Sequence, residues 1–389
     1  MLRTPRPLLR AGRVLACALA TAAAGLVLAA CTAPQRPSPG PTTTTTSEPG
    51  SACVPAPSHW APARIATQLL MVIGSFTSVQ SLAPEARAGA GGFVFLGEPA
   101  ASAGPALHVA LASLGSDADG ADAVAPWMST DTEGGPVSRL ANVLGPIPSA
   151  RQMAAQWTPS QVESAMEARG AALRQLGITM DLAPVLDTAE PTDPVADESQ
   201  RSFSATPAVV SAYGAAFAAG LRASGVVAVG KHFPGLGHAS ANTDTGPATD
   251  PPLAQLRAVD LLPFAHAVAA GLPVVMVGHP VVPGLSGGLP ASLSPATYTL
   301  LRRTLHFQGV AMTDALDAGA ISATGDTEAV AAVAALRSGA DMAMVDASTW
   351  PLVVHALVQA LSDGTLSRPQ ADESVRRILV AKGVAACAG

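Results

Sequence analysis

Short apolar runs recur along the chain from about residue 69 onward, and stretches with helical spacing of their apolar positions separate them. Runs of four to eight apolar residues, bounded by polar or glycine-containing turns, predict buried strands. The expected strands are residues 69–74, 92–96, 125–131, 180–185, 226–232, 274–279, 310–314 and 342–346. Strands that alternate with helices in this way predict an α/β fold with a parallel sheet.

The expected helix starts support this alternation. Thr158, Thr206 and Ser294 each stand directly before a proline, which pairs an N-cap hydroxyl with Pro at the first helical position. Thr158 and Gln161 also have the spacing of a capping box. The number and order of elements therefore predict a single-domain (β/α)8 TIM-type barrel over residues 53–389. A doubly wound open sheet is the alternative, but no Gly-x-Gly-x-x-Gly turn follows the first strand.

The first 30 residues have the pattern of a secretory signal. Four arginines precede the apolar stretch 14–28, which ends in Leu28-Ala29-Ala30-Cys31. This end resembles a bacterial lipobox, so Cys31 is expected to be the lipidated first residue of the mature protein. The alternatives are an ordinary secretory signal or a single membrane anchor, for which the run is short. A lipidated Cys31 predicts attachment to the extracytoplasmic face of a cell membrane.

Residues 31–52 are rich in Pro, Ser and Thr and are expected to be a flexible linker. The whole chain has 22 Lys and Arg against 28 Asp and Glu, and four of the arginines lie in residues 1–30. The remainder therefore has 18 basic residues and a formal charge of −10, which disfavours nucleic acid as a partner. Charged residues make up 13% of the chain, about half the usual share, which predicts a large buried core.

Two cysteines, Cys53 and Cys387, flank the expected folded region. In an oxidising compartment they could form a disulfide, and the sequence leaves this open. No His/Cys spacing indicates a structural metal site, and no cofactor is expected.

Polar residues follow several expected strands at their C-terminal ends. Asp131 ends the third, Lys231 and His232 the fifth, His279 the sixth and Asp314 the seventh. In a barrel these ends share one rim, where ligands bind. Carboxylates, cations and imidazoles together can both accept from and donate to the hydroxyl groups of a sugar. The pattern therefore predicts a carbohydrate site.

Six motifs in order resemble those of glycoside hydrolase family 3, and in particular its single-domain, NagZ-like bacterial β-N-acetylglucosaminidases. The resemblance covers nearly all of the region after Cys53. The motifs are Asp131-Thr132-Glu133-Gly134-Gly135 with Arg139 downstream, Asp181 to Asp187, Arg201-Ser202-Phe203, Lys231 to Gly237, Pro290 to Ser294, and Gly309 to Asp314.

This resemblance implies residue roles. Asp314 corresponds to the nucleophile, which attacks the anomeric carbon and forms a glycosyl-enzyme in a retaining mechanism. The residues implied to bind the sugar are Asp131, Arg139, Arg201, Lys231 and His232.

The chain departs from the family pattern at the acid/base residue. The NagZ-like group uses a His in the loop after the fifth strand, two residues beyond an Asp, and Gly246 stands where that His is expected. A pair formed by His238 and Asp244 is the predicted replacement, if the loop folds back. The alternative is that neither residue is catalytic.

The leading functional prediction is a retaining exo-β-N-acetylglucosaminidase acting on cell-wall peptidoglycan fragments. The alternatives are a phosphorylase or a β-glucosidase on the same scaffold, and a non-catalytic lipoprotein that binds muropeptides. A phosphorylase needs an acid/base that tolerates an anionic acceptor, and a neutral or cationic group does so better than a carboxylate.

Overall fold

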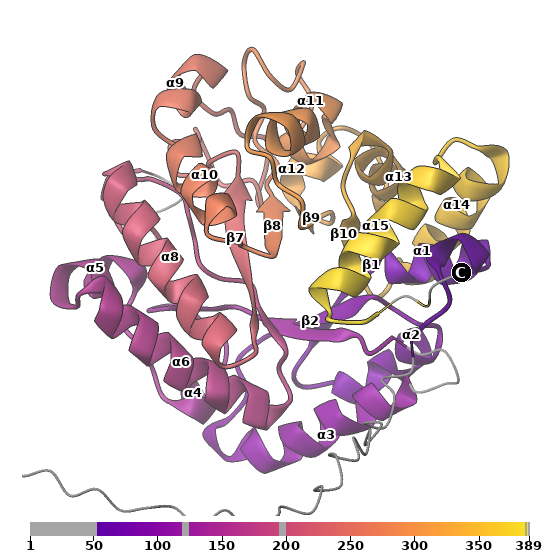
Figure 1. Ribbon diagram of the computed structural model, residues 1–389, viewed down its shortest axis with the longest axis horizontal. Coiled ribbons are helices and arrows are strands. Elements are labelled where there is room, and N and C mark those ends of the chain that lie inside the picture. Colours follow the sequence, from indigo (N-terminus) through magenta and orange to yellow (C-terminus); the bar gives the residue numbers. More distant parts are fainter. Residues whose placement is uncertain (1–52, 119–123, 194–199, 386, 388–389) are drawn as a thin grey trace, which may run out of the picture. The chain divides into compact units, whose positions relative to one another are not determined.

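The computed structural model describes residues 53–118, 124–193, 200–385 and 387, and within them eight parallel strands close into a barrel in the order β1-β10-β9-β8-β7-β6-β3-β2. Figure 1 shows the helices around the outside of these strands. The predicted α/β, (β/α)8 TIM-type barrel is confirmed. The expected signal peptide (1–30), Cys31 and the linker (31–52) lie outside the described residues.

The strands of the barrel and of a small antiparallel hairpin are short. Their bounds are β1 Leu70–Ser75, β2 Gly92–Leu96, β3 Trp127–Thr130, β4 Thr132–Gly134, β5 Val137–Ser138, β6 Met180–Asp181, β7 Val227–Phe233, β8 Val274–Val277, β9 Val310–Ala315 and β10 Met342–Asp346. All eight predicted strand positions correspond to barrel strands, and the β4–β5 hairpin was not predicted. Strand residues are buried almost throughout, because helices cover the outer face of the parallel sheet.

The helices alternate with the barrel strands, as predicted. Their bounds are α1 Pro62–Gln68, α2 Ala83–Arg87, α3 Gly104–Asp117, α4 Ala141–Leu144, α5 Ala150–Gln156, α6 Pro159–Leu176, α8 Pro207–Ala223, α9 Leu253–Ala258, α10 Leu261–Ala269, α11 Pro295–Thr299, α12 Gly319–Ser322, α13 Glu328–Ser338, α14 Trp350–Asp363 and α15 Arg368–Ala381. None of the helices in the described part of the chain combines the length and the apolar character needed to cross a bilayer.

Proline marks the start of α6, α8 and α11, as expected. The predicted capping box of Thr158 and Gln161 is present at α6. Thr206 and Ser294 occupy the N-cap positions of α8 and α11, but their side chains make no capping hydrogen bond. Proline at the first helical position fixes φ for the helix without help from the cap.

Strand β6 is shorter than predicted, with two residues instead of the expected 180–185. Pro184 has no N–H with which to continue the ladder, so the chain beyond Asp181 pairs with β7 irregularly. Val229 donates to the Ala183 carbonyl and Lys231 to the Pro184 carbonyl, with N···O distances of 2.9 and 3.1 Å. The segment after β6 therefore stays against β7, close to Lys231.

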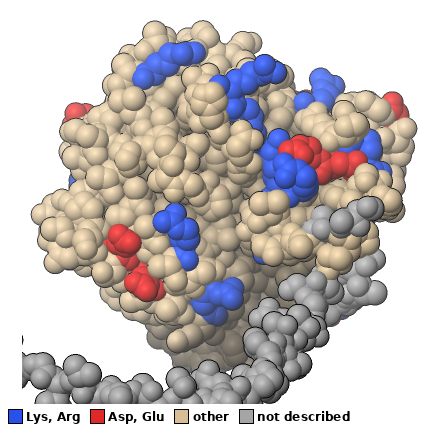
Figure 2. Space-filling view, viewed as in Figure 1, with Lys and Arg blue, Asp and Glu red and all other residues tan. Residues whose placement is uncertain are grey.

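The surface carries few charges for its area. On the face drawn in Figure 2, Lys, Arg, Asp and Glu side chains form small separate groups among uncharged residues. This agrees with the 13% of charged residues in the chain.

Cys53 and Cys387, whose pairing the sequence left open, form a disulfide with a Cα–Cα distance of 4.9 Å. Beside it, Val54 N–H donates to the Ala385 carbonyl and Cys387 N–H donates to the Val54 carbonyl, at 3.0 and 2.8 Å. The bridge joins residues 334 positions apart, so it closes almost the whole folded region into one loop.

Replacement of both bridge cysteines by serine is expected to destabilise the domain by about 2–4 kcal/mol, because the unfolded chain regains the conformations that the closed loop excludes. Thermal unfolding under non-reducing conditions measures the effect. Wild-type protein with a reductant is the control and should unfold at the midpoint of the double variant. Equal midpoints for the oxidised wild type and the variant would show that the bridge contributes nothing.

Candidate active site

The C-terminal ends of the barrel strands surround a cavity of about 510 Å³. Apolar side chains from several strands form its floor, among them Ile73, Val94, Leu182, Met276 and Met344. Polar side chains form its walls, namely Asp131, Glu133, Arg139, Arg201, Lys231, His232, Asn242, Asp244, Asp314 and Asp317. All five residues predicted to bind a sugar, together with Asp314 and Asp244, therefore line one cavity.

Lys231, on β7, is the buried cation of this cavity, with 3% of its side chain exposed. Its Nζ lies 2.7 Å from Asp131 Oδ1 and 2.7 Å from Glu133 Oε1. Burial opposes the charge, but Asp131 and Glu133 hold the pKa of Lys231 above its usual range. An ammonium group has three N–H donors, so these two carboxylates leave one donor for a ligand.

Arg201 forms a bidentate pair with Glu133. Its Nε and Nη2 donate to the two carboxylate oxygens at 2.8 Å each. Burial alone would raise the pKa of Glu133, but Arg201 and Lys231 together hold it well below its usual range. Glu133 is therefore ionised at neutral pH and fixes the orientation of both cations.

The turn that carries Asp131 and Glu133 is tied to the next barrel strand. Thr132, between them, donates both its N–H and its hydroxyl to the Asp181 carboxylate at the end of β6. Arg139 lies farther off, with Nε 3.9 Å from Asp131 Oδ2. Asp131 thus faces Lys231 directly and Arg139 at longer range.

His232 is held by Asp187, a residue to which the sequence assigned no role. His232 Nδ1 lies 2.7 Å from Asp187 Oδ2, and the N–H groups of His232 and Leu236 donate to Oδ1 at 3.1 and 2.8 Å. Since a carboxylate only accepts, Nδ1 carries the proton. His232 Nε2 lies 3.3 Å from Arg201 Nη2.

Asp314 lies on β9, and its Oδ1 accepts a hydrogen bond of 2.8 Å from the Ala315 N–H. Burial alone would raise its pKa, but His232, the Ala315 N–H and Lys231 hold the pKa of Asp314 below its usual range. The carboxylate is therefore ionised at neutral pH and faces the cavity that contains Lys231 and Arg201.

His279 contacts the end of β9, next to Asp314. Its Nε2 lies 2.8 Å from the Ala315 carbonyl oxygen, which can only accept, so Nε2 carries the proton. Nδ1 then accepts from the Ser292 hydroxyl at 2.7 Å. Burial lowers the pKa of His279 and keeps the ring neutral.

The predicted pairing of His238 with Asp244 is wrong. His238 Nδ1 lies 2.9 Å from Asp260 Oδ1, a buried carboxylate that also accepts from Thr188, and this contact raises the pKa of His238. Among the described residues that line the cavity, Asp244 is present and His238 is not. The loop after β7 turns His238 toward Asp260 and carries Asp244 across to the end of β9.

Gly237 explains the first part of this arrangement. A Cβ atom at Gly237 would stand 1.9 Å from the Thr188 carbonyl oxygen, so only glycine allows the loop to lie against the segment after β6. This close approach brings the neighbouring His238 to the Thr188–Asp260 pair.

The sequence did not identify Glu133 and Asp187 as functional, although both stand in motifs quoted above. A usable signal was present, since each is a carboxylate at a strand end of the rim that carries Lys231 and His232. In the part of the chain that the structure describes, no group of three or more His, Cys, Asp or Glu residues has the arrangement of a metal site.

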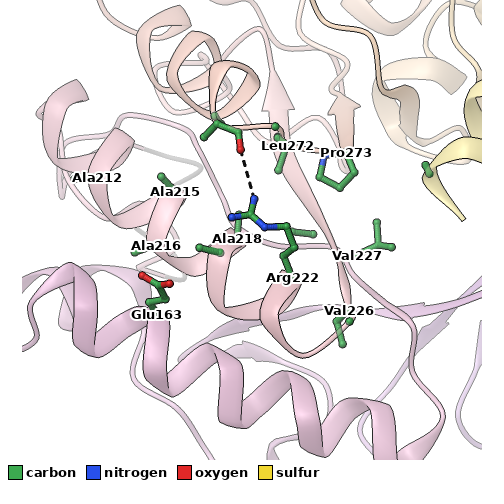
Figure 3. A pocket seen from close by; sticks show the side chains of 17 residues that line it. Glu163, Ala212, Ala215, Ala216, Ala218, Arg222, Val226, Val227, Leu272 and Pro273 are labelled. Atoms are coloured by element: carbon green, nitrogen blue, oxygen red, sulfur yellow. Dashed lines mark hydrogen bonds between the residues drawn. The ribbon is translucent and has the colours of Figure 1, made fainter. Parts of the chain in front are cut away.

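A second cavity, of about 580 Å³, lies outside the barrel between α6, α8 and α10. Figure 3 shows small apolar side chains around it, with Glu163 at one side and Arg222 donating to the Ala270 carbonyl at 3.4 Å. It contains none of the residues predicted for the site. The candidate active site is therefore the cavity at the strand ends.

Comparison with known proteins bears on the chemistry of this site. Residues 116–381 match the model of the glycosyl hydrolase family 3 N-terminal domain. Over 266 residues the chain is 42% identical to the beta-hexosaminidase LpqI of Mycobacterium tuberculosis. The aligned region covers 66% of this chain and 68% of that relative.

Two solved structures have the same fold over most of the chain. M. tuberculosis LpqI gives a TM-score of 0.77 at 37% identity, covering 86% of this chain and 98% of that one. The beta-N-acetylhexosaminidase of Beutenbergia cavernae gives a TM-score of 0.78 at 29% identity, covering 84% of this chain and 100% of that one.

Glu133→Gln is expected to destabilise the domain at pH 7 by about 3–5 kcal/mol, because it leaves Lys231 and Arg201 with one buried anion fewer. The folded-state pKa of Glu133 lies below its ordinary value of 4.5. Its charge therefore contributes stability that is present above pH 4.5 and is lost as the pH falls further. Urea unfolding over a pH series should show the difference between wild type and variant shrinking below that pH.

The control for this series is Glu98→Gln, which removes the same charge from an exposed position. It should change the unfolding free energy by no more than about 0.5 kcal/mol. A Glu133→Gln variant as stable as wild type at pH 7 would contradict the view that this carboxylate balances the two cations.

Proposed function

Because the chain belongs to glycosyl hydrolase family 3, we propose that it is a β-N-acetylhexosaminidase that releases terminal N-acetylglucosamine with retention of configuration. The observation that carries the proposal is the ionised Asp314 carboxylate in a cavity that Lys231 and Arg201 also line. A neutral, polyhydroxylated ring fits between these groups, because its hydroxyls donate to carboxylates and accept from cations.

Asp314 is the nucleophile in this proposal. Its oxygen forms a bond to the anomeric carbon while the bond from that carbon to the leaving group breaks. The Ala315 N–H on Oδ1 and the depressed pKa keep the carboxylate ionised and ready to attack. His279 acts as a positioning residue, since its hydrogen bond to the Ala315 carbonyl holds the residue whose N–H contacts Asp314.

The sugar-binding residues are Asp131, Arg139, Arg201, Lys231 and His232. Their charges are already balanced, since Glu133 pairs with both Lys231 and Arg201. Side chains held in this way need little rearrangement when the ligand binds, which favours catalysis by preorganisation. Lys231 and the arginines donate to ring hydroxyls and to the N-acetyl carbonyl, and Asp131 accepts from a hydroxyl.

The proposed location is the extracytoplasmic face of a cell membrane, with the chain anchored by lipid on Cys31 and its substrate in peptidoglycan fragments. The signal pattern of residues 1–30 and the linker 31–52 support this. The Cys53–Cys387 disulfide supports it independently, because such bonds persist in oxidising compartments. A cell wall rich in N-acetylglucosamine is the substrate within reach of such an anchor.

Asp314→Asn is expected to lower kcat on nitrophenyl N-acetylglucosaminide by about 10³-fold or more, because an amide cannot form the ester intermediate. Binding of N-acetylglucosamine, measured by calorimetry, should persist. A 2-fluoro or 5-fluoro sugar should label Asp314 in the wild type and shift the mass of its peptide.

Asp363→Asn, at the exposed end of α14, is the matched control and should leave kcat unchanged. Near wild-type kcat in Asp314→Asn would refute the nucleophile assignment. Wild-type protein that releases nitrophenol from neither the N-acetylglucosaminide nor the glucoside would refute the proposed activity, and a preference for the glucoside would refute the proposed sugar.

Cys31→Ala is expected to abolish labelling by a palmitate analogue and to move the protein from the membrane fraction to the soluble one. Activity of the domain should be unchanged, because the linker separates the anchor from the barrel rim. Cys17→Ala is the matched control, since Cys17 lies in the signal and its loss should leave labelling intact. Persistent membrane association without the label would point to an uncleaved signal anchor.

A further inference from the structure

Five of the described residues that line the active-site cavity carry a carboxyl group, namely Asp131, Glu133, Asp244, Asp314 and Asp317. A retaining glycosidase needs a second group beside its nucleophile that first donates and then accepts a proton. Asp131 and Glu133 are unsuited to this task, because both are paired with Lys231. Asp244 and Asp317 remain.

The imidazoles near the cavity are already committed to other partners. The Nδ1 proton of His232 is held by Asp187, and its Nε2 faces Arg201. His279 has both ring nitrogens in hydrogen bonds to Ser292 and to the Ala315 carbonyl. A carboxyl group is therefore the available proton carrier.

We propose that Asp244 is the general acid and base of this enzyme, and that its carboxylate commits the glycosyl-enzyme to water rather than to phosphate. This rests on the proposed function, since it presupposes Asp314 as the nucleophile. In this proposal Asp244 acts without His238, because the structure places His238 against Asp260.

The backbone around Asp244 is fixed beside the nucleophile's strand. The N–H of Gly319 donates to the Asp244 carbonyl at 2.9 Å, and the N–H of Ala320 donates to the Thr243 carbonyl at 3.0 Å. A Cβ atom at Gly319 would stand 2.5 Å from the carbonyl carbon of Thr245, so glycine is needed for this approach. The loop from β7 is thereby docked on α12, five residues beyond Asp314.

Asn242 orders the same turn. Its Oδ1 accepts from the Asp244 N–H at 2.8 Å, and its carbonyl accepts from the Thr245 hydroxyl at 3.1 Å. Asn242 also lines the cavity. Asp244 is exposed and also lines the cavity, so its carboxyl group is accessible both to a bound sugar and to water.

Asp317 is the competing candidate, and its position differs. It lies in the turn directly after β9, three residues beyond Asp314, whereas Asp244 comes from the loop after β7. The two carboxyl groups of a retaining enzyme flank the glycosidic bond, which groups on separate segments can do. Asp317 lies beside Asp244 and Asp314, and burial together with Asp346, Asp244 and Asp314 raises its pKa.

Two proton transfers through Asp244 accompany the two bond exchanges at the anomeric carbon. In the first step, protonated Asp244 gives its proton to the glycosidic oxygen while the bond from that oxygen to the anomeric carbon breaks. At the same time, Asp314 forms a bond to the anomeric carbon. Ionised Asp244 then takes a proton from water, whose oxygen bonds to the anomeric carbon while the bond to Asp314 breaks. In this second step Asp244 and Asp317 repel an anionic acceptor, which disfavours phosphate.

The test compares Asp244→Ala with Asp317→Ala, which removes another carboxyl group that lines the same cavity. Asp244→Ala should lower kcat/KM on an N-acetylglucosamine disaccharide by about 10²- to 10⁴-fold. The loss on the nitrophenyl glycoside should be much smaller, because nitrophenolate leaves without being protonated. Added azide should restore turnover of the nitrophenyl glycoside by this variant and give the β-glycosyl azide. Wild type and Asp317→Ala should give no azide product.

Three results would overturn the proposal. Equal losses on both substrates without azide product would show that Asp244 only shapes the cavity. Azide product from Asp317→Ala alone would assign the proton transfer to Asp317. Sugar 1-phosphate formed by the wild type in phosphate buffer would refute the choice of water. Failure of the proposed function looks different, because the wild type would then be inactive or Asp314→Asn would be active.

Discussion

The contact of Lys231 with Asp131 and Glu133 is the interaction on which the rest of the site depends. A buried ammonium group is tolerated only where anions balance it, and here two carboxylates lie 2.7 Å from its Nζ. Glu133 in turn holds Arg201, which reaches His232, and His232 is held by Asp187. Each strand end is thus positioned by a charge on another. Such networks stabilise a fold no better than apolar packing would, so their value lies in the chemistry they prepare.

The barrel makes this network possible by bringing distant residues to one rim. Asp131 and Lys231 are 100 residues apart in the chain, and Glu133 and Arg201 are 68 apart. The strands that carry them are buried and regular, whereas the segments that follow them are irregular and carry the polar groups. The rigid part of the molecule therefore determines where the chemistry takes place, and the loops determine what that chemistry is.

Strand positions and the rim of the site could be predicted from the sequence, because apolar runs of strand length end in polar residues. The Asp314 position followed from the same pattern and the family motif. The pairing of His238 could not be predicted, since its partner Asp260 lies 22 residues later and on a different segment. Likewise, Asp187 meets His232 across 45 residues. Contacts of this kind depend on how loops pack against the rest of the fold. The position of the loop after β7 depends on two close approaches, that of Gly237 to Thr188 and that of Thr245 to Gly319 of α12.

The bridge between Cys53 and Cys387 also has a mechanical consequence. Any force transmitted along the chain from before residue 53 arrives at a point joined covalently to the other end of the domain. Val54 there is paired with Ala385 and Cys387, so the load is shared between the first and last segments of the barrel. A pull from before residue 53 therefore loads the segment that leads to β1 and the segment that follows α15 together. The packing of both ends of the domain has to yield at once, and this is a higher barrier than the loss of either end alone.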